Sequence, residues 1–159
     1  MSETMEKNLS ITPASPNLDD EEQKVQSTDY MIGVSDSLRY GIDAEKVETI
    51  LTDYTITHMP CVPSYVRGIM NLRGQIVPII DLRLRLGKMP ADECIIMVVR
   101  LESESVGILV DSVEKMVSIP QNIILPMPTQ NAQKLVSGMC SLPEGGTLLI
   151  LDCDLLLRG

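Results

Sequence analysis

The segment GIMNLRGQIVPII, residues 68–80, has the pattern of two short strands joined at Arg73-Gly74. Apolar residues dominate both halves, and glycine supplies the positive φ that a two-residue hairpin turn requires. We assign Asn71 and Gly74 to this turn. Pro78 cannot donate a ladder hydrogen bond, so we expect its strand to lie at a sheet edge or at a bulge. The segment therefore predicts a β-hairpin that presents Arg73 outward at its turn.

Three further pairs of apolar runs surround this hairpin, and a short turn separates the two runs of each pair, as is typical of hairpins. The pairs are 30–34 with 39–43, 94–101 with 105–111, and 134–142 with 147–151. Residues 44–51 differ, because their apolar positions follow helical spacing after Asp43, a suitable N-cap. We also expect a helical turn after Asp152. The chain is therefore predicted to be mainly β, with short helices.

A weak internal repeat runs through the chain, because three blocks recur in the same order 66 to 71 residues later. Gly41, Val47 and Ile50 recur as Gly107, Val113 and Met116, GIMNL (68–72) recurs as GMCSL (138–142), and VPIIDLRLRL (77–86) recurs as LLILDCDLLL (148–157). This collinear order predicts two similar five-stranded β-barrel subdomains that share one aliphatic core. Closure into barrels would hide their edge strands.

The core must be aliphatic, because the chain has no Phe or Trp and only four Tyr. Residues 1–27 are acidic and poor in apolar side chains, which predicts a disordered arm that folding does not need, and residues 28–159 form the predicted domain. The longest aliphatic run, residues 95–99, is far too short to span a membrane, and the start of the chain does not resemble a signal peptide. We therefore expect a cytoplasmic protein without membrane insertion.

Charge is distributed unevenly along the chain. The whole chain has a net charge of −9, whereas residues 67–88 hold five basic residues against Asp81 alone. A bipolar surface of this kind can steer two partners to different faces. The simpler alternative is that Arg83 and Arg85 are solvated. Nucleic-acid binding is disfavoured, because an acidic chain without a basic, aromatic surface lacks the contacts that phosphates and bases require.

Catalytic motifs are absent from the sequence. His58 is the only histidine, and neither a G-x-S-x-G elbow nor a Gly-rich phosphate loop occurs. We therefore expect no catalysis, no metal and no cofactor, and we interpret the four cysteines as small, buried, reduced thiols. Two alternatives remain, a hydrolase that uses Cys61 with His58 and a small metal-binding protein with the same two side chains among its ligands.

The segment MPCVPSYVRGIMNLRGQIVPIIDLRLRLG (59–87), followed by VGILVDSV (106–113) and LLILD (148–152), closely resembles the CheW family of bacterial chemotaxis coupling proteins. The likeness extends from about residue 28 to residue 158. It implies two five-stranded β-barrels around a shared core, and a non-enzymatic adaptor that joins transmembrane chemoreceptors to the histidine kinase CheA. It also implies that the regulatory domain of CheA docks end to end with the barrels, and that the cytoplasmic tip of a chemoreceptor lies in an apolar groove between them.

The resemblance also implies which residues contact partners. Arg73 matches the functional arginine of the family's N-L-R-G motif. The groove positions fall on Val47, Ile95, Ile96 and Met116. The alternative for these four is that they are ordinary core residues. The chain departs from the family at Thr49, where many members carry a glutamate linked to the arginine. Its length leaves no room for a receiver or ATP-binding domain, so we expect a free-standing adaptor, in motility or in another receptor–kinase pathway.

Overall fold

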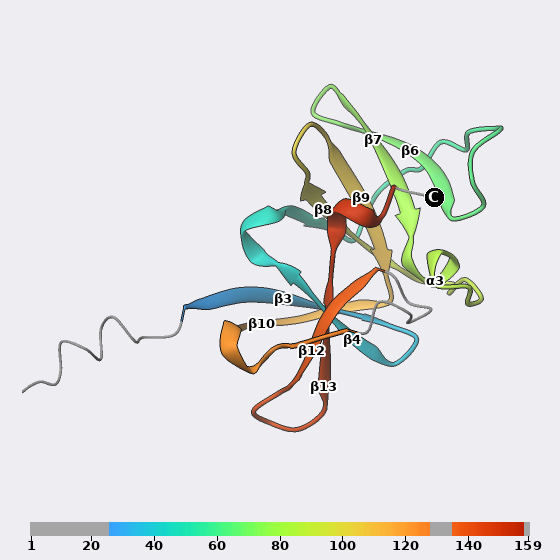
Figure 1. Cartoon of the computed structure of the whole chain (residues 1–159). Helices are drawn as coiled ribbons and strands as arrows, with labels where there is room; N and C mark the ends of the chain where they lie inside the picture. Colours follow the sequence, from blue (N-terminus) through green and yellow to red (C-terminus); the bar gives the residue numbers. More distant parts are fainter. Residues whose placement is uncertain (1–25, 128–134, 158–159) are drawn as a thin grey trace, which may run out of the picture.

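The computed structural model describes residues 26–127 and 135–157 of the chain. Strands in this part form two sheets, one in the lower part of the view in Figure 1 and one in the upper right. The predicted arm falls almost wholly on residues 1–25, which lie outside the described residues. The first strand begins at Ser27, next to the predicted start of the domain.

The first sheet has six strands in the order β10-β3-β4-β13-β12-β11. Neighbours are antiparallel except β13 and β4, which run parallel. The turn Asp36-Ser37 joins β3 to β4, so the first predicted hairpin is confirmed, and β12 with β13 confirms the last one. The strands are β3 (Ser27–Ser35), β4 (Leu38–Asp43), β10 (Ser112–Pro120), β11 (Leu125–Pro126), β12 (Val136–Ser141) and β13 (Thr147–Leu151).

The second sheet has five strands in the order β5-β8-β9-β7-β6, with β7 and β9 parallel. It contains the hairpin around Arg73-Gly74, because Leu72 on β6 pairs with Gln75 on β7. The strands are β5 (Val47–Leu51), β6 (Val66–Leu72), β7 (Gln75–Asp81), β8 (Ile95–Arg100) and β9 (Ser105–Val110). The short helices are η1 (Ala44–Lys46), α3 (Leu82–Arg85), η2 (Gln121–Ile123) and η3 (Cys153–Leu155), and η3 is the helical turn predicted after Asp152.

The register of the two sheets reflects the predicted repeat. Ile150 on β13 pairs with Gly41 on β4, and Ile79 on β7 pairs with Gly107 on β9, which are the same positions of the repeat. Each sheet nevertheless takes strands from both halves of the chain, since β10 to β13 join β3 and β4, while β5 to β7 join β8 and β9. The mainly β fold with two similar subdomains is confirmed, and closure of each sheet into a barrel stays a prediction.

Buried side chains form three clusters that are almost entirely aliphatic. The shared cluster lies between the sheets and includes Tyr40 from the first sheet and Ile108 from the second. A second cluster, around Ile32, belongs to the first sheet alone, and a third, around Ile79, belongs to the second sheet alone. The predicted shared core is therefore present, and each sheet has an additional core of its own.

The prediction of one helix over residues 44–51 is wrong. Asp43 does cap a helical turn, because its side chain accepts a hydrogen bond from the Glu45 N–H at 3.0 Å, but this turn ends at Lys46. Strand β5 follows at once and pairs with β8. Over such a short run, helical spacing and strand alternation place apolar residues at many of the same positions. The apolar pattern therefore could not distinguish a helix from a strand.

Pro78 does not lie at a sheet edge, because β7 runs between β6 and β9. Its partner on β6 is Ile69, which exchanges two backbone hydrogen bonds of 2.8 and 2.9 Å with Thr57 and therefore directs its polar groups away from β7. The pair of Ile69 with Pro78 is thus not hydrogen-bonded, and a proline costs β6 no ladder bond there. The nearest bulge lies on β6, between Val66 and Gly68.

Candidate functional site

The turn between β6 and β7 presents Arg73 at the surface. Arg73 and Gly74 have φ angles of 53° and 85°, as in the mirror-image turns that suit β-hairpins. The Asn71 side chain accepts a hydrogen bond from the Gly74 N–H at 3.0 Å, so the predicted turn residues Asn71 and Gly74 lie where expected. Ile76, just beyond the turn, is 60% exposed. This hairpin tip (Asn71 to Ile76) thus carries an exposed guanidinium and an exposed aliphatic side chain.

Arg73 differs from every other arginine and lysine that the structure describes. The others contact a carboxylate, a backbone carbonyl or an aromatic ring. Within the described part of the chain, the Arg73 side chain makes none of these contacts. A guanidinium without a partner keeps its fork of donors available for a carboxylate of another protein. Arg73 is therefore the described cation best placed to bind one.

Arg83 and Lys88 join the two sheets. The Arg83 guanidinium donates two hydrogen bonds to Asp111, from Nε to Oδ1 at 2.9 Å and from Nη2 to Oδ2 at 2.7 Å. Asp36, in the β3–β4 turn of the first sheet, lies 3.6 Å from Arg83 Nη1 and 3.0 Å from Lys88 Nζ. The alternative that Arg83 is merely solvated is therefore wrong, and much of the basic segment serves to hold the fold together.

Arg67 and Arg85 also bind groups of their own chain. Arg67 Nη1 donates to the buried carboxylate of Asp81 at 2.7 Å, and Asp81 in turn accepts from the Leu84 N–H and caps α3. Arg85 donates to two carbonyls of the C-terminal turn and lies over a tyrosine ring at 4.7 Å. Sequence reasoning missed α3, although the repeat contained its signal, because Asp152 caps η3 in the same way.

The Arg83–Asp111 pair predicts a pH-dependent contribution to stability. Hydrogen bonds from Arg83 hold the pKa of Asp111 below its usual value. Such a carboxylate stabilises the fold above its unfolded pKa of about 3.9, and this contribution is lost as the pH falls through the lower folded pKa. We expect Asp111→Asn to lower the urea midpoint of unfolding at pH 7 and to flatten its decline between about pH 5 and pH 2. Urea titrations across this range measure both effects.

Asp53→Asn is the matched control for this experiment. Asp53 is exposed, and its side chain makes no ion pair within the described residues, so Asp53→Asn should leave the urea midpoint at pH 7 unchanged. If Asp111→Asn declines with acid as steeply as the unsubstituted chain, the pair with Arg83 does not supply the predicted pH dependence.

The four predicted groove residues lie in different environments. Ile96 is fully buried in the core of the second sheet, which fits the alternative that it is a core residue. Val47 and Ile95 begin β5 and β8 and are half-buried against the shared core. Met116 on β10 is 52% exposed. Met116 is therefore the most accessible of the four, and Ile96 offers no surface to a partner in this arrangement.

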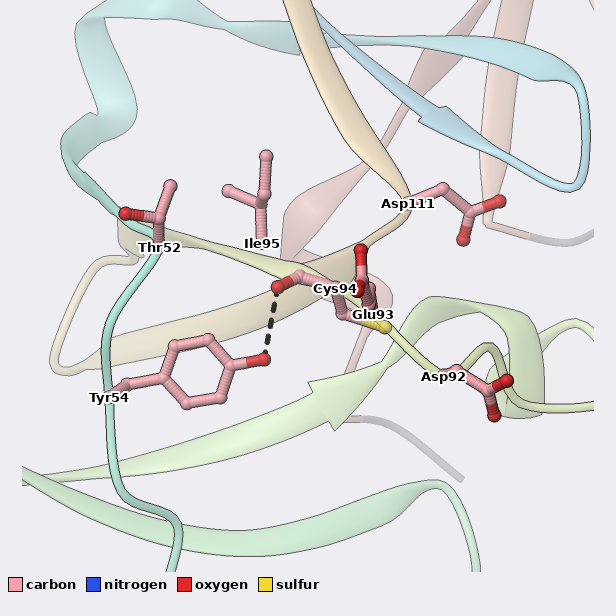
Figure 2. A pocket seen from close by; sticks show the side chains of 7 residues that line it. All are labelled: Thr52, Tyr54, Asp92, Glu93, Cys94, Ile95 and Asp111. Atoms are coloured by element: carbon pink, nitrogen blue, oxygen red, sulfur yellow. Dashed lines mark hydrogen bonds between the residues drawn. The ribbon is translucent and has the colours of Figure 1, made fainter.

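Ile95 and Met116 line two different cavities. The first, of about 450 Å³, lies beside the start of β8, and the Tyr54 hydroxyl there donates to the Cys94 carbonyl oxygen at 3.0 Å (Figure 2). Its other lining residues are Thr52, Asp92, Glu93 and Asp111. The second, of about 400 Å³, lies beside the start of β3, where Met116 faces residues 43–45. The two cavities occupy equivalent places in the repeat, so Ile95 and Met116 do not share one cavity, and Val47 and Ile96 line neither of them.

The residues of the two alternative functions show no catalytic arrangement. His58 and Cys61 are exposed in the segment before β6, and no hydrogen bond joins them in the described part of the chain. Cys61 is thus not buried as expected and Cys94 is only half-buried, whereas Cys140 and Cys153 are buried, and burial raises the pKa of Cys153 to about 12. Among residues 26–127 and 135–157, no three His, Cys, Asp or Glu side chains are grouped closely enough to hold a metal ion.

The described helices are all too short to cross a membrane. Comparison with known proteins gives consistent results. A family model for the CheW-like domain matches residues 30–159. The chemotaxis protein CheW of Klebsiella aerogenes is 31% identical over 135 residues, which cover 81% of each chain. A probable chemotaxis protein CheW of Rhizobium etli is 44% identical over 75 residues, which cover 45% of this chain and 48% of that protein.

A solved structure is similar over most of the chain. The scaffolding protein TtCheW of Thermoanaerobacter tengcongensis superposes with a TM-score of 0.77 at 27% identity, covering 84% of this chain and 94% of that one. The family model and the Klebsiella aerogenes protein each match most of the region that forms the two sheets. This chain therefore belongs to the CheW-like family of chemotaxis adaptor proteins, which are not enzymes.

Proposed function

We propose that this chain couples transmembrane chemoreceptors to the histidine kinase CheA in a chemotaxis signalling array. Membership of the CheW-like family supports the role of an adaptor. The observation that carries the proposal is the exposed guanidinium of Arg73, which has no partner among the described residues and lies at a hairpin tip where the Asn71 side chain accepts a hydrogen bond from the Gly74 N–H. Both proposed partners present their signalling parts to the cytoplasm, so the chain would work there, beside the receptors.

Arg73 is the proposed contact with the array partner that activates the kinase. Its guanidinium can pair with a carboxylate through two parallel hydrogen bonds, and the exposed Ile76 adds apolar area next to the turn. Thr49, which stands where many family members carry a glutamate, lies on β5, at the opposite end of the strand order from β6. Because the Arg73 side chain has no partner among the described residues, its charge is left for another protein.

Met116 is the proposed anchor for the receptor tip. An amphipathic helix binds a groove through apolar side chains spaced along one face, and exposed Met116 beside its cavity is suited to such a contact. Half-buried Ile95 can add apolar area at the first cavity, and half-buried Val47 begins β5 just after residues 43–45, which line the second. Since Ile96 is fully buried, the proposed receptor contacts are Met116 and Val47 near the second cavity and Ile95 at the first.

Met116→Ser is expected to weaken binding of a receptor signalling fragment roughly tenfold, about 1.4 kcal/mol. Because the side chain is half exposed, the free energy of unfolding should change by no more than about 0.5 kcal/mol. Val47→Ser should weaken binding as well, but also cost about 1 kcal/mol of stability, because Val47 packs on the shared core. Titration calorimetry with the receptor fragment and thermal melting measure the two effects.

Met89→Ser is the matched control, since Met89 is 77% exposed and lies in the loop before β8. It should bind the receptor fragment normally. A loss of binding to the CheA regulatory domain in step with the loss of receptor binding would contradict a separate receptor groove.

A pull-down with two baits tests the proposed function directly. One bait is the regulatory domain of CheA, and the other is a receptor signalling fragment. We expect the full chain to bind each bait separately and both together. Failure to retain either bait would contradict the proposal.

A further inference from the structure

The chain crosses between the two sheets at two places that correspond in the repeat. The first crossover, residues 43–46, leads from β4 in the first sheet to β5 in the second. The second crossover is Asp111, which leads from β9 in the second sheet to β10 in the first. The repeat aligns Glu45 with Asp111, so the two crossovers can be compared contact by contact.

The second crossover is held by a dense set of contacts. Asp111 accepts both hydrogen bonds of the Arg83 fork, at 2.9 and 2.7 Å, and a third at 3.0 Å from the Asp36 N–H. Its own N–H donates to the Val34 carbonyl oxygen at 2.8 Å. Lys88 binds the Asp36 carboxylate at 3.0 Å and closes the cluster. Bidentate, charge-assisted pairs of this kind are stronger than hydrogen bonds between neutral groups.

The first crossover has far fewer contacts. Its only ion pair within residues 26–127 and 135–157 joins Lys46 Nζ to Asp154 Oδ2 at 3.7 Å, and the two side chains are 37% and 52% exposed. None of the three residues in η1 is buried. Cavities of about 400 and 160 Å³ adjoin residues 43–46, and one of about 450 Å³ adjoins Asp111, so the two crossovers differ in their contacts and not in the cavities beside them. Exposed single pairs of this length contribute little to stability, and segments with few buried contacts open first.

We propose that the first crossover is a hinge, at which the two sheets open on the side of Val47 and Met116 while Arg83 and Asp111 hold the other side closed. Val47 begins β5 directly after the hinge and is half-buried in the closed arrangement. Opening there exposes Val47 to an apolar helix that already touches Met116. The functional consequence rests on the proposed receptor groove, whereas the hinge itself is a property of the chain alone.

Hydrogen exchange in the full chain tests the hinge without any partner. The Val47 N–H donates to the Ala44 carbonyl oxygen, and the Asp111 N–H donates to that of Val34, so both amides are hydrogen-bonded. After correction for intrinsic rates, we expect the Val47 amide to exchange at least about tenfold faster than the Asp111 amide. Equal rates, or slower exchange at Val47, would overturn the hinge.

Lys46→Arg tests the cause, because an arginine can form at Asp154 the fork that Arg83 forms at Asp111. It should slow exchange of the β5 amides about threefold. The matched control Lys115→Arg makes the same substitution in the exposed pair with Glu144, which lies within the first sheet and should leave β5 unchanged. The same comparison is made with Asp154 replaced by alanine. If Lys46→Arg still slows exchange of the β5 amides in that background, the pair of Lys46 with Asp154 is not the cause.

Binding of a receptor fragment tests whether opening of the hinge is needed for receptor contact. If opening precedes binding, Lys46→Arg should weaken binding of the receptor fragment by the same factor, about threefold, and leave the CheA regulatory domain unaffected. Slower exchange with unchanged receptor affinity would confirm the hinge and overturn its link to the receptor. If the unsubstituted chain binds no receptor fragment, the proposed function fails, while the exchange results still decide whether the hinge exists.

Discussion

Replacing Gly68 with alanine is expected to lower the free energy of unfolding by about 3 kcal/mol or more. Gly68 on β6 has a φ of 148°, and a Cβ added there would lie 2.1 Å from the carbonyl oxygen of Thr57. That oxygen is held in place, because Thr57 and Ile69 exchange two backbone hydrogen bonds. The added methyl group must therefore break this bridge or distort β6. Calorimetry should show a melting temperature lower by roughly 10 °C.

Two other glycines are controls for this result. Gly74 also has a positive φ, of 85°, but nothing lies within 4 Å of a Cβ added there, so Gly74→Ala should cost only the strain of the backbone, about 1–2 kcal/mol. Gly138 is the repeat partner of Gly68, and a Cβ there would lie 2.7 Å from Ile124 Cγ2 and 2.9 Å from the Leu125 carbonyl oxygen, so Gly138→Ala should also be destabilising through close contact. Equal losses at Gly68 and Gly74 would show that close approach of Thr57 is not the cause.

The sequence could predict the hairpins because their signals are local. Turn residues between apolar runs place each hairpin within a few residues, and Arg73-Gly74 lies in the turn for this reason. The repeat also predicted correspondences that the register bears out, such as Gly41 with Gly107. The repeat did not indicate that each sheet takes strands from both halves, because two equal halves have the same pattern whichever half supplies a given strand.

Burial within β8 could not be predicted from the pattern. The run Ile95 to Val99 is apolar at every position and has no alternation, so it does not distinguish half-buried Ile95 from fully buried Ile96. The sequence pattern also could not predict which carboxylates the arginines bind. Arg83 binds Asp111, which is 28 residues away in the chain, and Asp36 in the other sheet. Ion pairs of this kind depend on how the two sheets pack, and the spacing of residues along the chain does not indicate that packing.

Replacing Arg73 with alanine is expected to abolish kinase activation in reconstituted receptor arrays, while the variant melts normally. The φ of 53° at Arg73 is a conformation that costs an ordinary residue about 1–2 kcal/mol and that glycine adopts freely. An arginine at such a strained position, exposed and without a partner among the described residues, indicates a role in binding rather than in folding. Loss of an interface arginine typically costs roughly 1–3 kcal/mol of binding free energy.

Arg73→Gly separates binding from folding more sharply than alanine does. Because glycine relieves the backbone strain, this variant should melt at or slightly above the temperature of the unsubstituted chain and still fail to activate the kinase. Arg73→Lys keeps the charge but loses the planar fork, so it should restore only part of the activity if the partner group is a carboxylate. Both variants are measured by thermal melting and by kinase activity in the same arrays. Full activation by Arg73→Gly would show that the hairpin tip binds no partner through its guanidinium.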